Sequence, residues 1–458
     1  MASAARPNVI LLLARAALGA NLQAPPDRRP AARPRDLDKF EGVNLLRRLI
    51  IIFNALFLAL GYELPNLYFE FLKITPSDNS FFILPSLALS LILGIAVYGI
   101  YGDQSARQKT LQTAFLVLSF SLIACFLFHH IISFYFALFS VGIIISVLPI
   151  YVLEIMPSLY RGSGFVNALI TLILGMITST SIAMELGPIY IMCFAIASSL
   201  IAVFLVQYLI ESPAWLMLEH QNHEAAHLLK MIREPKKIAK EIAVIKSALS
   251  RRQRIWFSLY KNQLKEKIKI SFVLAILRQM TGVSVMLLYF PHEIFLANSE
   301  KIVPLFILFA ILSGLIFSAL NIDYLGRRCL LILSLWVQLI TLSVLIIYPI
   351  FIQGDWQLWV SFEAYLIYLI GYAAGAGPVT WLLSIELMPL KKRSQMTSFF
   401  LITTIVSGAL IYSLSLYAIQ SLGFFNLTVL VFALSAACAL VYSYRKVPET
   451  KNRILDEI

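Results

Sequence analysis

The feature that most constrains this chain is a series of long apolar segments separated by short polar ones. A helix rises about 1.5 Å per residue and the hydrocarbon layer of a bilayer is roughly 30 Å thick, so about 20 apolar residues cross it. A helix also satisfies its own backbone hydrogen bonds in lipid. We therefore predict twelve transmembrane helices, near residues 49–65, 81–101, 111–128, 131–155, 165–184, 188–210, 268–290, 303–321, 330–352, 358–387, 396–419 and 424–444.

Composition excludes a soluble globule and a nucleic-acid-binding protein. Apolar residues make up 59% of the chain and charged residues 14%, which is too little charge to cover a soluble surface. The net charge of +12 could indicate a nucleic-acid partner, but Lys and Arg fall in short runs between apolar segments, as in membrane proteins. We therefore expect a lipid bilayer around the protein and no nucleic acid as a partner.

No residue pattern indicates an enzyme. The four cysteines are scattered and lack the spacing of a metal site or a disulfide framework. His223 and His227 stand at i and i+4, a spacing that can bind a metal, but no third ligand accompanies them. We also find no nucleophile with its base and no phosphate loop, so we predict no catalysis, no cofactor and no metal.

Positive charge is concentrated in alternate loops, which predicts the orientation. Loops rich in Lys and Arg stay in the cytosol. The opposite side has only Lys73 and Lys301, whereas one side has basic residues near 107–109, 161, 230–269, 327–328, 391–393 and 445–453. We expect both termini in the cytosol and the protein in the plasma membrane. The run from Glu41 to Leu46 matches an acidic dileucine sorting pattern, so an endosomal or lysosomal membrane is the alternative.

Composition also divides the chain into parts. Residues 1–45 are rich in Ala, Pro and Arg and are expected to form a disordered cytosolic tail, with a transit peptide as the alternative. The other parts are an N-terminal six-helix half, a cytosolic helical linker, a C-terminal six-helix half and a cytosolic tail, at residues 46–210, 211–267, 268–446 and 447–458. Within the linker, residues 214–231 and 238–249 have helical apolar spacing and predict two amphipathic helices.

An internal repeat relates the two sets of six helices. Acidic and basic residues recur in the second set at nearly constant offsets from the first: the segment from Glu154 to Arg161 recurs as Glu386 to Arg393, that from Asp103 to Arg107 as Asp323 to Arg327, and Glu211 as Glu449. Such a duplication builds two parallel halves that rock about a site near the membrane midplane.

Six motifs in this order resemble the signatures of the sugar porter family of the major facilitator superfamily. They are LPIYVLE at 148–154 with YRG at 160–162, ESPAWL at 211–216, QMTG at 279–282, DYLGRR at 323–328, GPVTW at 377–381 with Glu386, and VPETKNR at 447–453. The resemblance covers the chain from about Asn54 to its end. It implies an all-α membrane protein, the major facilitator fold, with twelve transmembrane helices in two pseudo-symmetric halves.

The resemblance also implies a cytosolic gate of ion pairs at helix ends, which closes one side of the transporter. Its residues here are Arg107, Glu154, Arg161, Glu211, Asp323, Arg327, Arg328, Glu386, Arg393 and Glu449. For any single arginine the alternative is plain orienting charge. The first half departs from the family pattern, with Ala106 and Gln108 around its arginine and Phe134 in place of a fourth-helix arginine. We therefore predict a weaker seal that opens inward more readily.

The substrate site departs further from the family. Several polar residues of the family are replaced, by Leu169, Arg278, Ser284, Ile311, Ala373 and Thr404, whereas Gln279, Tyr289 and Trp381 remain. The expected substrate-binding set is Arg278, Gln279, Ser284, Tyr289, Trp381 and Thr404. Each unmade hydrogen bond to a buried group costs about 1–3 kcal/mol, so tight binding of glucose is not expected.

Two ionisable residues inside the membrane extend the hypothesis. Glu63 stands where proton-coupled members carry an aspartate and is the candidate for proton coupling, and Arg278 is expected to face the substrate site. Arg278 could pair with Glu63 or with an anionic substrate, or could lie near the cytosolic end. The leading function is transport of a small polar solute, a monosaccharide such as a hexose or a polyol, by facilitative alternating access. The alternatives are transport of an organic anion (a sugar acid or urate) through Arg278, and a sensor that does not transport.

Overall fold

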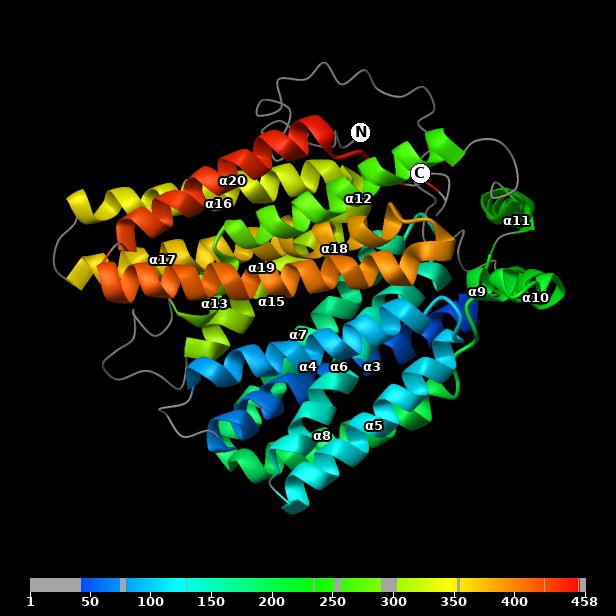
Figure 1. Ribbon diagram of the computed structural model, residues 1–458, viewed down its shortest axis with the longest axis horizontal. Helices are drawn as coiled ribbons and strands as arrows, with labels where there is room; N and C mark the ends of the chain where they lie inside the picture. The colour runs from blue at the N-terminus through cyan, green and yellow to red at the C-terminus, as the bar shows by residue number, and fades with distance from the viewer. Residues whose placement is uncertain are drawn as a thin grey trace, which may run out of the picture.

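The computed structural model describes residues 43–74, 80–128, 130–233, 235–250, 257–289, 303–351, 355–423, 425–451 and 453, and these form helices with no strand (Figure 1). Residues 1–42 of the predicted N-terminal tail lie outside the described part, as does most of the stretch after residue 451. The long helices fall into two groups, one in the upper and one in the lower part of Figure 1, which are the two halves predicted from the repeat.

The first group contains six long helices. They are α3 (Val43–Ile74), α4 (Ser80–Tyr101), α5 (Arg107–Phe128), α6 (Ile131–Ile155), α7 (Arg161–Leu186) and α8 (Pro188–Val206). Helix α3 packs along α7, and α6 packs against both α4 and α5. The approach of α3 to α7 is close because Gly61 and Gly175 face each other: a Cβ at Gly61 would lie 2.2 Å from the carbonyl oxygen of Leu172. Small residues allow this packing in lipid, where no hydrophobic force draws helices together.

The second group repeats the first with two interruptions. It contains α12 (Phe257–Met280), α13 (Val283–Leu288), α15 (Val303–Leu325), α16 (Arg327–Phe351), α17 (Asp355–Gly371), the π-helix η2 (Tyr372–Ala376), α18 (Gly377–Glu386), the 3₁₀ turn η3 (Leu390–Lys392), α19 (Arg393–Leu422) and α20 (Phe425–Lys446).

The break between α12 and α13 lies at Gly282. Its φ of +88° belongs to the left-handed region, and a Cβ there would lie 2.3 Å from the Phe432 ring. Both the backbone conformation and the lack of space for a side chain therefore require glycine. The second interruption is η2, which separates α17 from α18. Both irregular stretches lie within predicted membrane-spanning segments, where unpaired backbone is tolerated only inside the protein.

All twelve predicted segments correspond to helices, which confirms the all-α, twelve-helix prediction. Ten helices in the described part are long and apolar enough to cross a membrane. The other two segments are α4, whose described side chains begin at Ala88, and the seventh segment, which is divided into α12 and α13. Large apolar side chains such as Phe120, Leu320 and Leu414 are exposed on the outside of the bundle, as lipid contact requires.

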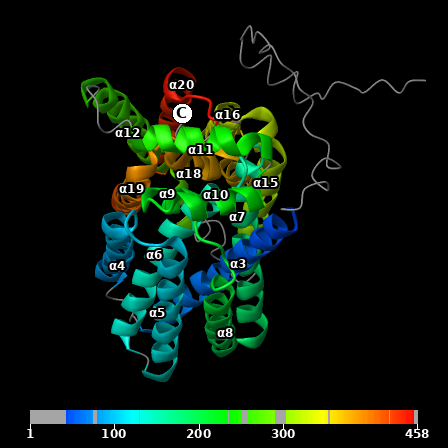
Figure 2. The ribbon, with the colours of Figure 1, turned by 90° about the vertical axis from the view of Figure 1, so that its right-hand side faces the viewer.

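The linker forms three short helices at one end of the bundle (Figure 2). They are α9 (Pro213–Leu218), α10 (Asn222–Ile232) and α11 (Pro235–Ser250). The prediction of a single helix over residues 214–231 is wrong, because the chain turns between α9 and α10 at His220, whose φ is 63°. Met217, Leu229 and Ile245 of the three helices pack together with Leu390 of η3, so the linker contacts the second half. We call this end of the bundle the charged end.

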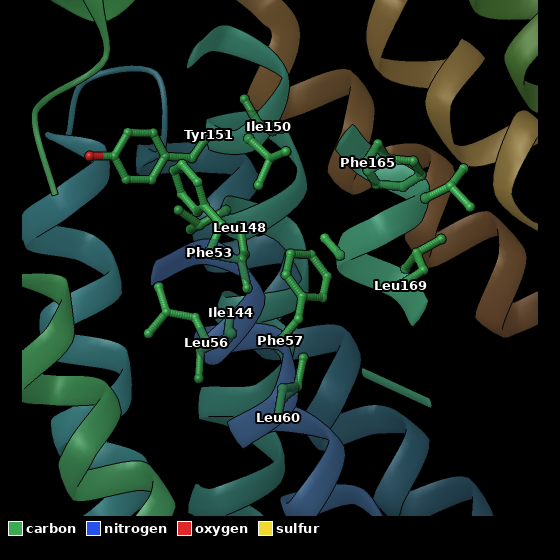
Figure 3. Packing of buried hydrophobic residues seen from close by; sticks show 14 of the residues in the cluster. Phe53, Leu56, Phe57, Leu60, Ile144, Leu148, Ile150, Tyr151, Phe165 and Leu169 are labelled. Atoms are coloured by element: carbon green, nitrogen blue, oxygen red, sulfur yellow. The ribbon is translucent and has the colours of Figure 1, made fainter. Parts of the chain in front are cut away.

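The largest apolar cluster lies where the halves meet and inside the first half. Phe53 and Phe57 of α3 pack near Leu148 and Tyr151 of α6, and Phe165 of α7 is at the edge that faces the second half (Figure 3). The same cluster includes Leu274 of α12 and several residues of α15 and α18. Packing across this contact holds the halves in one arrangement.

Candidate functional site

Glu154 joins the two halves at the charged end. Its Oε1 lies 3.1 Å from Nη1 of Arg393, the first residue of α19 in the other half. Its Oε2 lies 3.6 Å from Nε of Arg107 and accepts a hydrogen bond of 2.6 Å from the Ser212 hydroxyl. All four residues are buried. A carboxylate buried with two guanidinium groups is a strongly coupled arrangement that water must replace if the halves separate.

Glu386 forms the matching group in the second half. Its Oε1 lies 3.2 Å from Nη2 of Arg327 and 4.0 Å from Nη1 of Arg161, the first residue of α7 in the other half. The Thr450 hydroxyl donates to its Oε2. Ser212 and Thr450, which the sequence interpretation missed, directly follow Glu211 and Glu449 and so obey the same repeat. We refer to these two groups as the Glu154 cluster and the Glu386 cluster.

Two aspartates bind the first turns of helices from the opposite half. Oδ1 of Asp103 accepts the backbone N–H of Ser394 in α19 at 3.1 Å. Asp323 accepts the N–H groups of Gly162 and Ser163 in α7 at 3.2 and 2.8 Å. Helix N-termini attract negative charge because their first N–H groups lack partners. Burial raises the pKa of the Asp103 carboxyl above its ordinary value, although the Ser394 hydrogen bonds and the Arg107 charge act against this.

In each half, one glutamate caps the start of a helix. Glu211 accepts the backbone N–H groups of Arg107 and Gln108 at 2.9 and 3.2 Å, and burial raises its pKa. Glu449 accepts the N–H groups of Arg327 and Arg328, both at 3.0 Å. Glu211 therefore fixes the linker to α5, and Glu449 fixes the C-terminal segment to α16.

The departures from the family pattern in the first half leave these contacts in place. Gln108 donates its side-chain amide to the carbonyls of Val206 and Gln207 at 3.1 and 3.2 Å. Phe134 is buried in the apolar cluster. The Arg328 side chain lies apart from both clusters: it donates to the Tyr444 carbonyl and stacks over the Tyr444 ring. The structure brings together the other nine predicted gate residues.

Arg233 is a further residue that the sequence interpretation missed. Its guanidinium donates to the carbonyls of Ile155, Glu154 and Met156 at the end of α6, at 2.6 to 3.5 Å, and pairs with Glu241 of α11 at 2.9 Å. These are the carbonyls that a helix end leaves without partners. A lone arginine in a basic linker has no local signal that would have revealed this contact.

Three of the predicted binding residues, Arg278, Gln279 and Ser284, lie beside the break between α12 and α13. Gln279 is buried, and its Oε1 accepts a hydrogen bond of 2.8 Å from the Ser284 hydroxyl across the break. The adjacent Arg278 donates from Nε to the Tyr372 hydroxyl at 2.7 Å, with its guanidinium 5.5 Å from the ring centroid. Tyr372, in η2, was not predicted; a tyrosine beside a glycine-rich helix interruption is the signal that could have found it.

The other three predicted binding residues, Trp381, Thr404 and Tyr289, have different surroundings. Trp381 is partly exposed, contacts Phe165 of the other half edge to face at 5.7 Å, and has a buried indole N–H with no hydrogen bond in the described residues. The Thr404 hydroxyl donates to the Phe400 carbonyl of its own helix at 2.8 Å. Tyr289 packs in an apolar cluster of the second half with Met286.

Glu63 and Arg278 do not pair in this arrangement. Glu63 is fully buried in α3, and its Oε1 accepts a hydrogen bond of 3.3 Å from the Ser198 hydroxyl of α8. No ion pair of 4.0 Å or less joins Glu63 to Arg278 among the described residues. Pairing with Glu63, one of the alternatives for Arg278, is therefore not found in this arrangement. Arg278 is also far from the charged end, because its partner Tyr372 lies about four helical turns before Glu386, or roughly 21 Å of helix.

Comparison with known proteins decides the family. The family model described as "Sugar (and other) transporter" matches residues 45–458. This chain belongs to that sugar transporter family. One relative is solute carrier family 2, facilitated glucose transporter member 6, of Mus musculus. It is 25% identical to this chain over 346 residues, which cover 70% of this chain and 69% of the relative.

Two further comparisons support the family assignment and the fold. The probable metabolite transport protein CsbC of Bacillus subtilis is 26% identical over 400 residues, covering 82% of this family member and 84% of the relative. The proton:xylose symporter XylE of E. coli, solved with 6-bromo-6-deoxy-D-glucose, has a TM-score of 0.79 at 19% identity over 91% of this chain and 98% of its own. At that identity the likeness shows the major facilitator fold.

Proposed function

We propose that this protein carries a monosaccharide, such as a hexose, or a polyol across a membrane by facilitative alternating access. The relatives support the solute class, since they include a facilitated glucose transporter of mouse and a probable polyol transporter of Arabidopsis thaliana. The single observation that carries the mechanism is the pair of matched clusters, in which Glu154 meets Arg393 and Glu386 meets Arg161 across the two halves.

A gate must hold in one state and release in the other, and these clusters suit that task. When the halves are together, each carboxylate has arginine partners in a buried site, and the desolvation cost offsets much of the attraction. When the halves part, water replaces the lost partner, so the net loss for each pair is only about 0–3 kcal/mol. The two states are therefore close in free energy, and a bound solute can shift their populations.

The charged end is proposed to face the cytosol, where basic loops are retained. The gate residues are then those that the structure brings together at this end, with Arg328 as an outer member. Solute would bind near the α12–α13 break and η2, beside Gln279, Ser284 and Trp381. Tyr289 and Thr404 would line the same site. We propose the plasma membrane as the location.

Uptake by the purified full-length chain in proteoliposomes tests this function. We expect glucose, xylose or a polyol such as sorbitol to enter until the inside and outside concentrations are equal, with no effect of an imposed pH gradient. Accumulation above the outside concentration that needs an inward proton gradient, and that Glu63→Gln abolishes, would instead show symport. Binding without uptake of any solute would refute transport and favour a sensor.

A further inference from the structure

Arg278 is a cation in the interior of the bundle, away from the charged end. It occupies the last turn of α12, where the helix C-terminus favours positive charge. Leu274, one turn earlier on the same face, belongs to the apolar cluster shared by both halves, and Tyr372 packs against that cluster. The Arg278 side chain therefore points toward the contact between the halves and not toward lipid.

The partner of Arg278 sets it apart from the buried arginines at the charged end. Arg107, Arg161, Arg233, Arg327 and Arg393 each lie within 4.0 Å of a carboxylate. Arg278 instead donates from Nε to a phenol, and among the described residues its two terminal nitrogens make no hydrogen bond. The Cζ atom of Arg278 lies 5.5 Å from the centroid of the Tyr372 ring, within the range of a cation–π contact. The two terminal nitrogens of the Arg278 guanidinium group therefore remain available to bind a ligand.

The groups around Arg278 complete a small polar site. The Gln279 amide accepts from Ser284, and its nitrogen makes no hydrogen bond to any described residue. The site lies between two interruptions of membrane-spanning helices, the Gly282 break and η2, and such interruptions commonly form solute sites in transporters. Three positions that by the resemblance correspond to polar residues of the family are apolar here, namely Leu169, Ile311 and Ala373. One cation therefore replaces several neutral donors.

We propose that this site selects a sugar-class solute that carries a carboxylate, such as an aldonate or a uronate. The carboxylate binds the two terminal nitrogens of Arg278 in a bidentate pair, the geometry that a guanidinium fork matches and an ammonium does not. A hydroxyl of the same solute accepts from the Gln279 amide. This inference rests on the proposed transport function and narrows its substrate class.

The test compares acidic and neutral solutes in proteoliposomes that contain the full-length protein. Gluconate and glucuronate are the acidic probes, and glucose and sorbitol are the neutral probes. We expect the wild type to take up an acidic probe in preference to its neutral counterpart. Arg278→Gln should reduce acidic uptake by about 30-fold or more, the lower bound for removing one partner of a buried charge pair, and change neutral uptake by less than about threefold.

Two further variants separate binding from folding. Lys265→Gln removes the same charge from an exposed position of the same helix and should leave both uptakes unchanged. Arg278→Lys keeps the charge and loses the fork, so acidic uptake should fall less than in Arg278→Gln while preference for the acid persists. This variant also keeps the test decisive if Arg278→Gln does not fold.

Three results would overturn the inference in distinguishable ways. Uptake of neutral probes with acidic uptake no greater than in protein-free liposomes would refute the acidic substrate and leave the proposed function standing. Equal loss of both uptakes in Arg278→Gln, together with a lower melting temperature, would make Arg278 a structural residue. Uptake of no probe at all by the folded wild type would refute the proposed function as well.

Discussion

Glu154→Gln should open the charged end more than the symmetry-related Glu386→Gln. The amide keeps the size of the side chain and its bond from the Ser212 hydroxyl but removes the charge that holds Arg393 of the other half at 3.1 Å. The equivalent contact of Glu386 with Arg161 is longer, at 4.0 Å, and involves no hydrogen bond. The repeat predicts equal partners, whereas the distances predict unequal effects.

The magnitudes follow from these distances. With an effective dielectric constant of about 20, the attraction is about 5 kcal/mol at 3.1 Å and about 4 kcal/mol at 4.0 Å before desolvation. Desolvation removes most of it, leaving about 1.5–3 kcal/mol for a hydrogen bond between charged groups, which corresponds to a shift of about 10- to 150-fold toward the open state. For the longer contact of Glu386 we expect about 0–1 kcal/mol, or up to about fivefold.

Thiol labelling from the charged side measures this shift. Leu169 is 9% exposed and lies two turns along α7 from Arg161, so a Leu169→Cys reporter is shielded while the halves are together. In a background whose four native cysteines are replaced by serine, a membrane-impermeant maleimide should label the reporter about 10- to 150-fold faster after Glu154→Gln. Equal rates in the Glu154 and Glu386 variants, or a larger effect of Glu386→Gln, would refute the distance-based reasoning.

Three further outcomes are expected. Because burial raises the pKa of Asp103 when the halves are together, that arrangement binds the proton more tightly than an opened one. Lowering the pH from about 7 toward 5 should therefore slow labelling of the Leu169→Cys reporter relative to a free thiol peptide. Asp103→Asn should abolish this dependence. Arg233→Ala leaves buried carbonyls at the end of α6 without a donor, at about 1–3 kcal/mol each, and should lower the melting temperature by about 5 °C or more in a fluorescence-detected unfolding assay; an unchanged midpoint would contradict the capping role. Gln279→Ala and Trp381→Ala should each reduce uptake by about tenfold at unchanged surface expression, and normal uptake in both would move the solute site elsewhere.

The helices and their grouping could be predicted because both depend on local properties. Length and hydropathy alone identify a membrane-spanning segment, so each of the twelve predicted segments corresponds to a helix. The nearly constant offset between matching acidic segments predicted the two halves, and the same offset relates Arg161 to Arg393 in the structure. Where a local signal was weak, the prediction failed: residues 214–231 are two helices because the chain turns at His220.

Which charge meets which was decided by the tertiary structure. Arg393 is 239 positions from Glu154 in the chain, and their contact depends on how α19 packs beside α6. The sequence identified Glu63 and Arg278 as ionisable residues inside the membrane, but their partners, the Ser198 and Tyr372 hydroxyls, follow from the rotation of each helix about its axis. Hydropathy and repeats are properties of one segment at a time, whereas partner choice is a property of two segments packed together, and a rotation of one residue, about 100°, is enough to exchange one partner for another.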